Sequence, residues 1–555
     1  MSIKTIAVLD EAELKDGQMK EVAFEEGKVL LSRLGDEVHA TSAFCTHYVL
    51  GTEVPFLADI IIDGTAEGAF TIVACFNVCS GDIEDAPAPM ALHSFETQVK
   101  DGKIYVTANT ASTLKNNMSR QATLLSSGVN STGKGVVIVG GGSGAFHAVE
   151  GLREHGYAGP ITILTKESHT PIDRTKLSKA LLTDAAKIEW RTPADLKIKY
   201  GTNIRLGVEV TSVDIENKVV TIDNGKDTLG YDKLILAPGG TPRRLPIEGA
   251  QLENIFTFRD IEDSKKVDAA AQEGKRAVVI GSSFISMELV AALSKRRLAS
   301  IDVIGMEEFP FEVVLGKAVG AGIKKYHESQ GIKFHMSSKV EKIIPQEDSP
   351  NLAGGVVVNG TTLPCDFVIM GVGVAPATQF LKGSGLELER DGGIRVNKYL
   401  RVVSGKDQKN VYAIGDIAKY PQPDGTELRI EHWNVAGNHG RAVGSTIAGK
   451  AQPFVKIPVF WSAQGQQLRY CGAGAGYEDV IIKGDPDELK FIAYYVKAGK
   501  VVAVASMQND PVVAKASELL RLGLMPSPDE IMAGKDLLSI DISTASTKPE
   551  VVAEP

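Results

Sequence analysis

A glycine-rich turn over residues 140–145 (GGGSGA) is the motif whose residue types and spacing most clearly define a chemistry. It follows an apolar run and precedes a segment that can be helical. In this G-x-G-x-x-A pattern Gly140 makes the tight turn, Gly142 lets a pyrophosphate approach the backbone, and Ala145 allows the helix to pack closely. The free N–H groups at the start of the helix favour phosphate. Glu167 follows at the spacing of an acid that binds a ribose, so the segment predicts a dinucleotide site.

A second strand, turn and helix over residues 277–296 repeats this pattern in altered form. Gly281 keeps the first glycine position, but Ser283 and Ser286 occupy the second and third. Serine is small, so it hampers the approach of a pyrophosphate without forbidding it. Glu307 lies where a carboxylate would accept ribose hydroxyls and repel a 2′-phosphate, which favours NADH over NADPH. The alternative is a nucleotide fold that binds its nucleotide poorly.

Continuous apolar runs, which are typical of parallel strands covered on both faces, predict the sheets that position these turns. The runs are Val136–Gly140, Ile161–Leu164, Lys233–Gly240, Ala277–Gly281, Ile301–Gly305, Asp366–Gly373 and Val411–Asp416. Residues 1–107 instead read as short β segments between turns, such as Lys28–Arg33, Glu37–Ser42 and Lys103–Val106. From about residue 456 strands return, and a helix follows near Val512–Arg521.

We therefore expect a multidomain chain with an N-terminal all-β domain, two Rossmann-type α/β nucleotide-binding domains and a C-terminal α+β domain. The predicted bounds are 1–107 for the β domain, 108–134 for a linker rich in Ser, Thr and Asn, 135–257 with 376–455 for the first nucleotide-binding domain, 258–375 for the second, inserted one, 456–543 for the C-terminal domain, and 544–555 for a disordered tail.

The composition is that of an ordinary soluble globular protein: of 555 residues, 43% are hydrophobic and 23% charged, and the mean hydropathy is −0.02. The net charge of −9 argues against a nucleic-acid or anionic-membrane partner. No apolar stretch reaches the ~18 residues of a membrane span, and Asp10, Glu11 and Glu13 disfavour a presequence. Five cysteines are too few for a disulfide framework. We expect a cytoplasmic location, with mitochondrial association left open.

Four further motifs carry a resemblance to a known family. They are Pro171–Lys179, Lys233–Pro246, Val411–Ala418 and Glu431–Arg441. Together with the two nucleotide folds, they resemble the ferredoxin-reductase-like FAD/NADH oxidoreductases. Within that family the chain is most similar to the apoptosis-inducing-factor-like proteins that carry an N-terminal Rieske domain. The resemblance covers about residues 3–543.

The resemblance implies roles for individual residues. The FAD ligands would be Gly140, Gly142, Gly144, Ala145, Glu167, Arg174, Lys179, Ala237, Gly239 and Asp416, and the NAD ligands Gly281, Ser283, Ser286 and Glu307. Asp416 would bond the flavin ribityl chain, and Lys179 would lie near the reactive edge of the isoalloxazine. The catalytic candidates are Lys179 together with the residues that would line the nicotinamide and flavin faces, Glu288, Glu431 and Trp433. For each charged residue taken alone, a surface salt bridge is the alternative.

The lack of cysteine between Pro171 and Leu182 bears on where the electrons go. Disulfide reductases place a cysteine pair beside the flavin on the helix in this region. Cys365 and Cys471 are isolated in the sequence, and we expect them to be buried as small apolar residues. We therefore expect a hydride to pass from NADH to FAD, followed by single electrons to a one-electron acceptor or by reaction with oxygen or a quinone.

The N-terminal module resembles a Rieske domain that keeps half of its site. Cys45 and His47 form the Cys-x-His half of a site in which two Cys hold one iron and two His hold the other. The Cys-x-x-His half is absent, because Ala69 and Ile72 stand at its positions. The unusual spacer 48–73 reflects either a true loss of the cluster or an error in the gene model. A 2Fe–2S cluster is thus implied by the resemblance, while the ligands present supply only a half site.

Three functions stay open at this point. The first is an NADH-dependent FAD oxidoreductase whose acceptor is its own Rieske module or an external ferredoxin-type partner. The second is a nucleotide-sensing interaction protein with weak catalysis, as in relatives of the apoptosis-inducing-factor group. The third is the reductase component of an oxygenase. The C-terminal unit resembles the interface domain of the family, which sometimes forms a dimer contact, so a homodimer is a further option.

Overall fold

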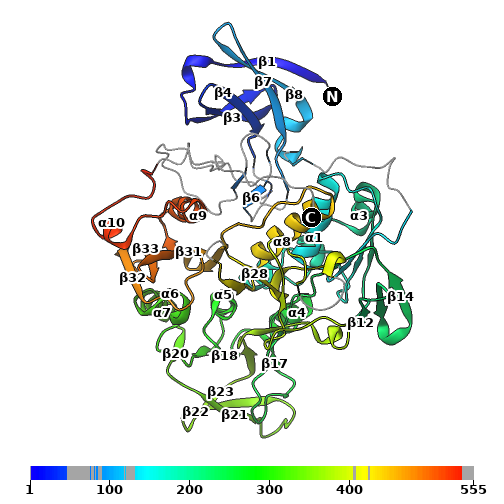
Figure 1. Cartoon of the computed structure of the whole chain (residues 1–555). Coiled ribbons are helices and arrows are strands. Elements are labelled where there is room, and N and C mark those ends of the chain that lie inside the picture. The colour runs from blue at the N-terminus through cyan, green and yellow to red at the C-terminus, as the bar shows by residue number, and fades with distance from the viewer. Residues whose placement is uncertain are drawn as a thin grey trace. The chain divides into compact units, whose positions relative to one another are not determined.

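The computed structural model describes residues 2–44, 46, 75–76, 81, 83–85, 90–117, 119–120, 132–403, 408–422 and 425–540 (Figure 1). The chain divides into two compact units. One comprises residues 1–124, 510–526 and 533–548, and the other comprises 125–509, 527–532 and 549–555. Both predicted dinucleotide sites fall in the second unit. In the described part of the chain, no helix is both long and apolar enough to cross a membrane.

The first unit is built on an antiparallel six-stranded sheet, which confirms the β segments expected near the N-terminus. Its strands, in spatial order, are β1 (Ile3–Asp10), β8 (Lys103–Asn109), β7 (Ser94–Lys100), β4 (Glu37–Ser42), β3 (Gly27–Leu34) and β2 (Met19–Phe24). A short pair, β5 (Cys75–Phe76) and β6 (Ile83–Asp85), stands apart from it. Alternating residues such as Leu31, Ile104 and Val106 are fully buried, so one face of the sheet carries the core of this unit.

The second unit begins with a five-stranded parallel sheet that contains the first glycine-rich turn. Its order is β11 (Thr202–Arg205), β10 (Ile161–Leu164), β9 (Val136–Val139), β15 (Lys233–Leu236) and β27 (Val411–Ala413). All four pairings are parallel, as the apolar runs predict. Every residue of β9 is buried, because helices and loops cover both faces of the sheet.

A second parallel sheet carries the other turn. Its order is β17 (Ile255–Phe256), β24 (Phe367–Met370), β18 (Arg276–Ile280), β19 (Ser300–Ile304) and β20 (Lys333–His335). The helix α5 (Phe284–Leu293) follows β18 directly after the turn. The second strand, turn and helix therefore form as the sequence predicts.

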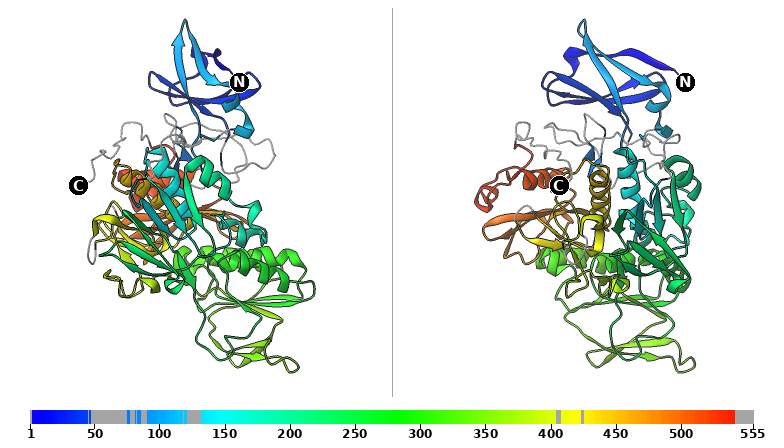
Figure 2. Two further views of the ribbon diagram at one scale, coloured as in Figure 1. Left: turned by 90° about the vertical axis from the view of Figure 1, so that its right-hand side faces the viewer. Right: turned by 45° about the vertical axis from the view of Figure 1, so that its right-hand side comes forward.

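The C-terminal part of this unit is an antiparallel five-stranded sheet. Its order is β30 (Val459–Gln464), β31 (Gln466–Gly472), β34 (Lys500–Met507), β33 (Lys490–Lys497) and β32 (Asp479–Asp485). It lies against α6 (Glu312–Leu315) and α7 (Lys317–Ser329) in Figure 1 and Figure 2. The hydroxyl of Tyr495 donates to the carbonyl of Leu315 in α6 (3.1 Å), and Lys325 of α7 pairs with Asp487 (2.6 Å).

The other elements of the described chain complete the fold. The remaining strands are β12 (Val210–Asp214), β13 (Val219–Ile222), β14 (Asp227–Gly230), β16 (Gly240–Pro242), β21 (Val340–Pro345), β22 (Ala353–Val358), β23 (Thr361–Pro364), β25 (Val374–Pro376), β26 (Ile394–Arg395), β28 (Ala418–Pro421) and β29 (Glu427–Arg429). The remaining helices are α1 (Ser143–Glu154), α2 (Thr175–Ala180), α3 (Pro193–Tyr200), α4 (Ile261–Ala270), α8 (Trp433–Ile447), α9 (Val512–Leu522) and α10 (Pro528–Met532).

The helices α1 and α8 lie side by side at the first nucleotide turn (Figure 1). Glycines on both helices permit this close approach. A Cβ on Gly440 would lie 2.4 Å from the carbonyl oxygen of Gly144, and one on Gly444 would lie 2.6 Å from the amide nitrogen of Leu152. The pair therefore brings the start of α8, with Trp433, next to the start of α1.

His439, in the middle of α8, is fully buried between the rings of Tyr420 and Phe454. Its Nδ1 accepts from the amide of Gly415 (3.2 Å). Burial lowers the pKa of His439 to about 3. The folded chain therefore keeps this imidazole neutral at pH values where the unfolded chain protonates it.

This burial predicts an acid-sensitive fold. Between pH 6 and pH 4 the unfolded state binds a proton at His439 that the folded state does not, so the free energy of unfolding falls as the pH is lowered. One such proton contributes a slope of about 1.4 kcal/mol per pH unit. In His439→Asn, whose side-chain oxygen can still accept from Gly415, we expect that much of the slope to vanish in urea unfolding of the apoprotein. An unchanged slope would contradict the prediction.

Candidate active site

The first turn has the form of a pyrophosphate cradle. Gly140 has a φ of +115°, and a Cβ there would lie 2.0 Å from the carbonyl oxygen of Ala237, so only glycine fits. A Cβ on Gly142 would meet no atom within 4 Å. Gly142 is the N-cap residue of α1, and it has no side chain that could bond the free amides of the helix. The amides at the start of α1 thus face open space beside the backbone, which fits a pyrophosphate. Ala145 is fully buried, as its predicted packing role requires.

Four charged side chains connect the ends of the first sheet beside this cradle. Arg174 donates to Glu167 (2.6 Å) and, through its other nitrogen, to the carbonyl of Arg259 (2.7 Å). Arg259 in turn donates to Asp416 (2.5 Å). Gly239, with a φ of +71°, leaves room for the Arg259 guanidinium, because a Cβ there would approach it to 3.0 Å. The predicted ribose acid Glu167 and the predicted ribityl ligand Asp416 thus belong to one network, and Arg259 is its member that sequence reasoning missed.

A buried carboxylate, Glu288, forms the centre of a second cluster. Its Oε2 accepts from Ser178 (2.5 Å) and from the Lys179 ammonium (3.1 Å), both on α2. Its Oε1 accepts from Ser462 on β30 (2.8 Å). Glu288 is only 5% exposed, so these three donors replace the water that a carboxylate needs. The structure therefore brings the catalytic candidates Lys179 and Glu288 together, with Ser178 and Ser462 as partners that the sequence did not reveal.

The other two catalytic candidates, Glu431 and Trp433, lie at the start of α8 but have different surroundings. Trp433 lies among the aromatic rings of Trp190 and Trp461, and Ser143 of α1 donates to its carbonyl (2.9 Å). Its indole N–H is buried and has no hydrogen-bond partner among the described residues. Glu431 is exposed and pairs with Arg429 (2.6 Å). Trp433 is thus placed beside the cradle, whereas Glu431 is held by a cation.

His432 lies between these two residues in the sequence, and its imidazole is influenced by the positive charge of Lys179. Burial, together with the positive charge of Lys179, lowers the pKa of His432 to about 3. Its Nδ1 accepts from the amide of Asn434 (3.2 Å). The neutral imidazole therefore carries its proton on Nε2.

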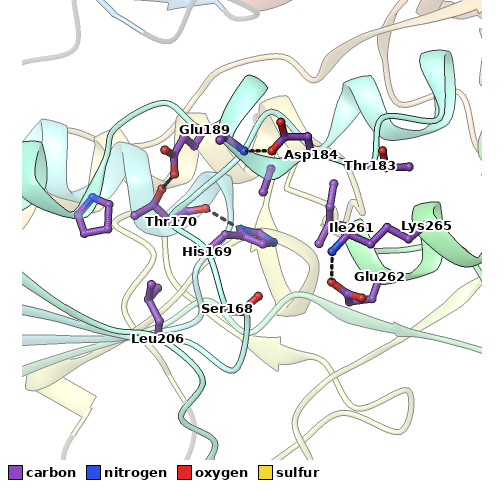
Figure 3. A pocket seen from close by; sticks show the side chains of 13 residues that line it. Ser168, His169, Thr170, Thr183, Asp184, Glu189, Leu206, Ile261, Glu262 and Lys265 are labelled. Carbon is purple, nitrogen blue, oxygen red and sulfur yellow. Dashed lines mark hydrogen bonds and ion pairs between the residues drawn. The ribbon is translucent and has the colours of Figure 1, made fainter.

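A cavity of about 350 Å³ lies beyond Glu167, at the carboxyl ends of β10 and β11. Figure 3 shows Ser168, His169 and Thr170 on one side of it and Ile261 and Lys265 on the other. His169 Nδ1 lies 2.7 Å from the carbonyl of Thr170, and its Nε2 has no partner among the described residues. None of the residues that line the cavity belongs to the network of Glu167, Arg174, Arg259 and Asp416.

The second turn keeps the geometry of a nucleotide site despite its serines. Gly281 has a φ of +103°, and a Cβ there would lie 2.3 Å from the carbonyl oxygen of Gly371. Ser286 is fully buried and its hydroxyl faces that same carbonyl (3.4 Å), so it packs against the sheet. Ser283 is exposed at the start of α5 and makes no cap hydrogen bond with it. Of the two serines, only Ser283 stands on the phosphate side.

The acid predicted for the second ribose lies close to this turn. Glu307 follows β19, whose neighbour in the sheet is β18, the strand that leads into the turn. Its Oε2 lies 3.4 Å from the hydroxyl of Ser282. The carboxylate therefore stands at the carboxyl end of the sheet, beside the predicted phosphate position.

The predicted half site for iron, Cys45 and His47, lies outside the described residues, as do Ala69 and Ile72. Over the part of the chain that the structure describes, no group of three or more His, Cys, Asp or Glu side chains could hold a metal ion. Cys365 and Cys471 are fully buried, as expected. Burial raises the pKa of the Cys365 thiol to about 12, so it stays an inert thiol.

Two parallel sheets with glycine turns, together with the Lys179–Glu288 pair between α2 and α5, are typical of a flavoprotein oxidoreductase that uses FAD and NAD(P)H. Residues 134–440 match the family described as pyridine nucleotide-disulphide oxidoreductase, and residues 459–540 match the reductase C-terminal family. The chain belongs to the pyridine nucleotide-disulphide oxidoreductase family. Within it, the chain is of the ferredoxin-reductase type and similar to apoptosis-inducing factor 3, which confirms the resemblance to these oxidoreductases; the two matching family models do not cover the Rieske-like module.

Three similar proteins show how far the likeness extends. Apoptosis-inducing factor 3 of Homo sapiens is 35% identical over 522 residues, which are 93% of this chain and 84% of the human protein. Rhodocoxin reductase of Rhodococcus erythropolis is 29% identical over 72% of this chain and 92% of its own length. In the solved covalent putidaredoxin reductase–putidaredoxin complex, one chain matches with a TM-score of 0.68 and 26% identity, over 75% of this chain and 99% of that one.

Proposed function

We propose that this protein is an NADH-dependent FAD oxidoreductase that delivers single electrons to an iron–sulfur acceptor of the ferredoxin type, in the cytoplasm. The observation that carries the proposal is the Lys179–Glu288 pair, which joins α2, the helix after strand β10 of the first sheet, to α5, the helix after the second turn. The helix α2 contains no cysteine, so the disulfide chemistry that the family name mentions has no redox pair there.

The residues at the first turn fit FAD. The amides at the start of α1 and the open side of Gly142 suit its pyrophosphate, and Glu167 suits its ribose. Arg174 and Arg259 are the cations that we expect beside the pyrophosphate, and Lys179 is the cation that we expect at the reactive edge of the flavin. When bound, FAD supplies the exchange between a two-electron donor and a one-electron acceptor. The chain orients the two partners and excludes water.

Two relatives support the choice of acceptor. A solved structure from Rhodopseudomonas palustris is a ferredoxin reductase, and putidaredoxin reductase is solved in covalent complex with putidaredoxin. A small iron–sulfur protein is therefore the acceptor that we propose for this chain. The Rieske-like N-terminal module, with Cys45 and His47, would be such an acceptor within the chain if it assembles a cluster.

The visible absorption spectrum of the purified full-length chain, with iron and flavin measured on the same sample, tests the proposal. We expect flavin bands that bleach on anaerobic addition of NADH and recover on addition of an oxidised ferredoxin. A chain without flavin, or flavin that NADH leaves oxidised, would overturn it. About two irons per chain would identify the N-terminal module as a cluster carrier, and no iron would leave an external protein as the acceptor.

Ser283 favours a second candidate function, a nucleotide-sensing interaction protein. This exposed hydroxyl stands where the fingerprint has glycine, and it narrows the approach of the NADH pyrophosphate. Weak catalysis with a change of oligomeric state on NADH binding would support this candidate. Rapid reduction of a ferredoxin or a cytochrome by NADH would exclude it.

The position of Glu307 predicts the choice of nicotinamide cofactor. Its carboxylate would repel a 2′-phosphate, so Glu307→Gln should improve kcat/KM for NADPH about tenfold, which is about 1.4 kcal/mol, and weaken NADH binding. Glu308→Gln is the matched control, because the adjacent Glu308 is exposed and pairs with Lys317 (2.5 Å). Steady-state kinetics with both nucleotides check the prediction, and equal effects of the two substitutions would contradict it.

A further inference from the structure

The hydroxyl that holds the outer oxygen of Glu288 belongs to a longer chain of buried polar groups. Ser462 donates to Glu288 Oε1 (2.8 Å), and Gln464 Nε2 donates to Ser462 Oγ (3.0 Å). Gln464 Oε1 lies 3.0 Å from His327 Nε2 on α7. The side chains of Ser462, Gln464 and His327 are at most 1% exposed, so water does not complete their hydrogen bonds. The chain runs from α7 through β30 to the carboxylate.

The charge at one end fixes the direction of every bond in this chain. An ionised carboxylate only accepts, so Ser462 must donate its single proton to Glu288. Ser462 then accepts, which requires the amide nitrogen of Gln464 to face it. The amide oxygen of Gln464 therefore faces His327 and accepts from Nε2–H. If the amide of Gln464 were reversed, its oxygen would face Ser462, and Ser462 would have to donate its proton to that oxygen. The lone pairs of the Ser462 oxygen would then face the carboxylate of Glu288.

The state of His327 agrees with this direction. Burial lowers the pKa of His327, so the imidazole is neutral and has one proton to give. Donation to Gln464 assigns that proton to Nε2. Each member of the chain then donates toward Glu288, and donors aligned in this way strengthen one another in a low-dielectric interior.

We propose that Ser462, Gln464 and His327 are positioning residues that hold the carboxylate of Glu288 against Lys179. Because Lys179 is the cation that the proposed function places at the flavin, this inference rests on that function. The aligned donors satisfy Oε1, which leaves Oε2 for Lys179 and Ser178. They also connect α7, which packs beside the second nucleotide sheet, to the flavin lysine through a strand of the C-terminal sheet.

Ser462→Ala tests the proposal in the FAD-loaded protein. Loss of this donor removes one of the three hydrogen bonds to the carboxylate, so the acid limb of the pH profile for anaerobic flavin reduction by NADH should move to higher pH in this variant. Ser462→Thr keeps the hydroxyl and should restore the wild-type profile. Gln464→Met, one step further away, should move it in the same direction by less. The matched control is Ser506→Ala, since Ser506 on β34 is equally buried and its hydroxyl has no partner among the described residues.

A second measurement does not depend on activity. In urea unfolding of the apoprotein, Ser462→Ala should lose more stability at pH 8 than at pH 4.5, because only the carboxylate form of Glu288 needs the donor. If Ser462→Ala and Ser506→Ala give the same pH profile and the same pH-independent change in stability, the inference is wrong. If the wild-type protein lacks flavin or is not reduced by NADH, the proposed function fails. The stability comparison still decides whether Ser462, Gln464 and His327 position Glu288.

Discussion

Gly142→Val should prevent the protein from retaining FAD while leaving the apoprotein as stable as the wild type. The backbone at Gly142 is extended, with φ −94° and ψ −161°, a conformation that valine adopts freely. A Cβ there meets no atom within 4 Å in the apoprotein. The added side chain would instead occupy the space that the pyrophosphate needs.

We expect the Kd for FAD, measured by quenching of flavin fluorescence, to rise at least ~100-fold, which is about 2.7 kcal/mol. Gly140→Ala serves as the contrast. Its Cβ would collide with the carbonyl oxygen of Ala237 at a φ of +115°, so it should destabilise the apoprotein itself. If Gly142→Val bound FAD like the wild type, the pyrophosphate would have to lie elsewhere.

Lys179→Met should slow the reduction of bound flavin by NADH about 100-fold, which is about 2.7 kcal/mol of activation free energy. The substitution removes the cation at the flavin and leaves the buried carboxylate of Glu288 without its counter-charge. Breaking a buried pair at one partner is more damaging than replacing both partners. The double variant Lys179→Met/Glu288→Leu should therefore be more stable than Lys179→Met while remaining slow.

Lys176→Met is the matched control for this series. Lys176 lies on the same helix, has a similar exposure and pairs with Asp173 (3.5 Å) instead of Glu288. Stopped-flow reduction and urea unfolding should separate the two lysines. Equal rates in Lys179→Met and Lys176→Met would remove Lys179 from the catalytic candidates.

The parallel sheets were predictable from the sequence because their signal is local. Val136–Val139 and Ala277–Ile280 are continuous apolar runs, and each ends at the edge where a nucleotide turn follows. The positive φ of Gly140 and Gly281 follows from the same fingerprint. A short-range pattern of this kind determines strands and turns before any distant contact is known.

The partners of the charged residues were not predictable, because they come from distant segments. Arg259 meets Asp416 across 157 residues, and Ser462 meets Glu288 across 174. One local signal was available: Ser462 and Gln464 alternate on one face of an otherwise apolar strand, and polar groups on a buried face need partners. The family motif that contains Trp433 also makes Glu431 a catalytic candidate, and the pairing of its carboxylate with Arg429 is another contact that the sequence did not predict.

The donors around Glu288 have a mechanical consequence. They come from α2 and β30, while Glu288 itself belongs to α5, so three separate segments meet at one carboxylate. A hinge motion that moved α5 away to admit a nucleotide would separate the carboxylate of Glu288 from its hydrogen-bond donors. Leaving this buried charge without partners would cost several kcal/mol. We therefore expect NADH to bind without a large displacement of α5 from α2 and β30.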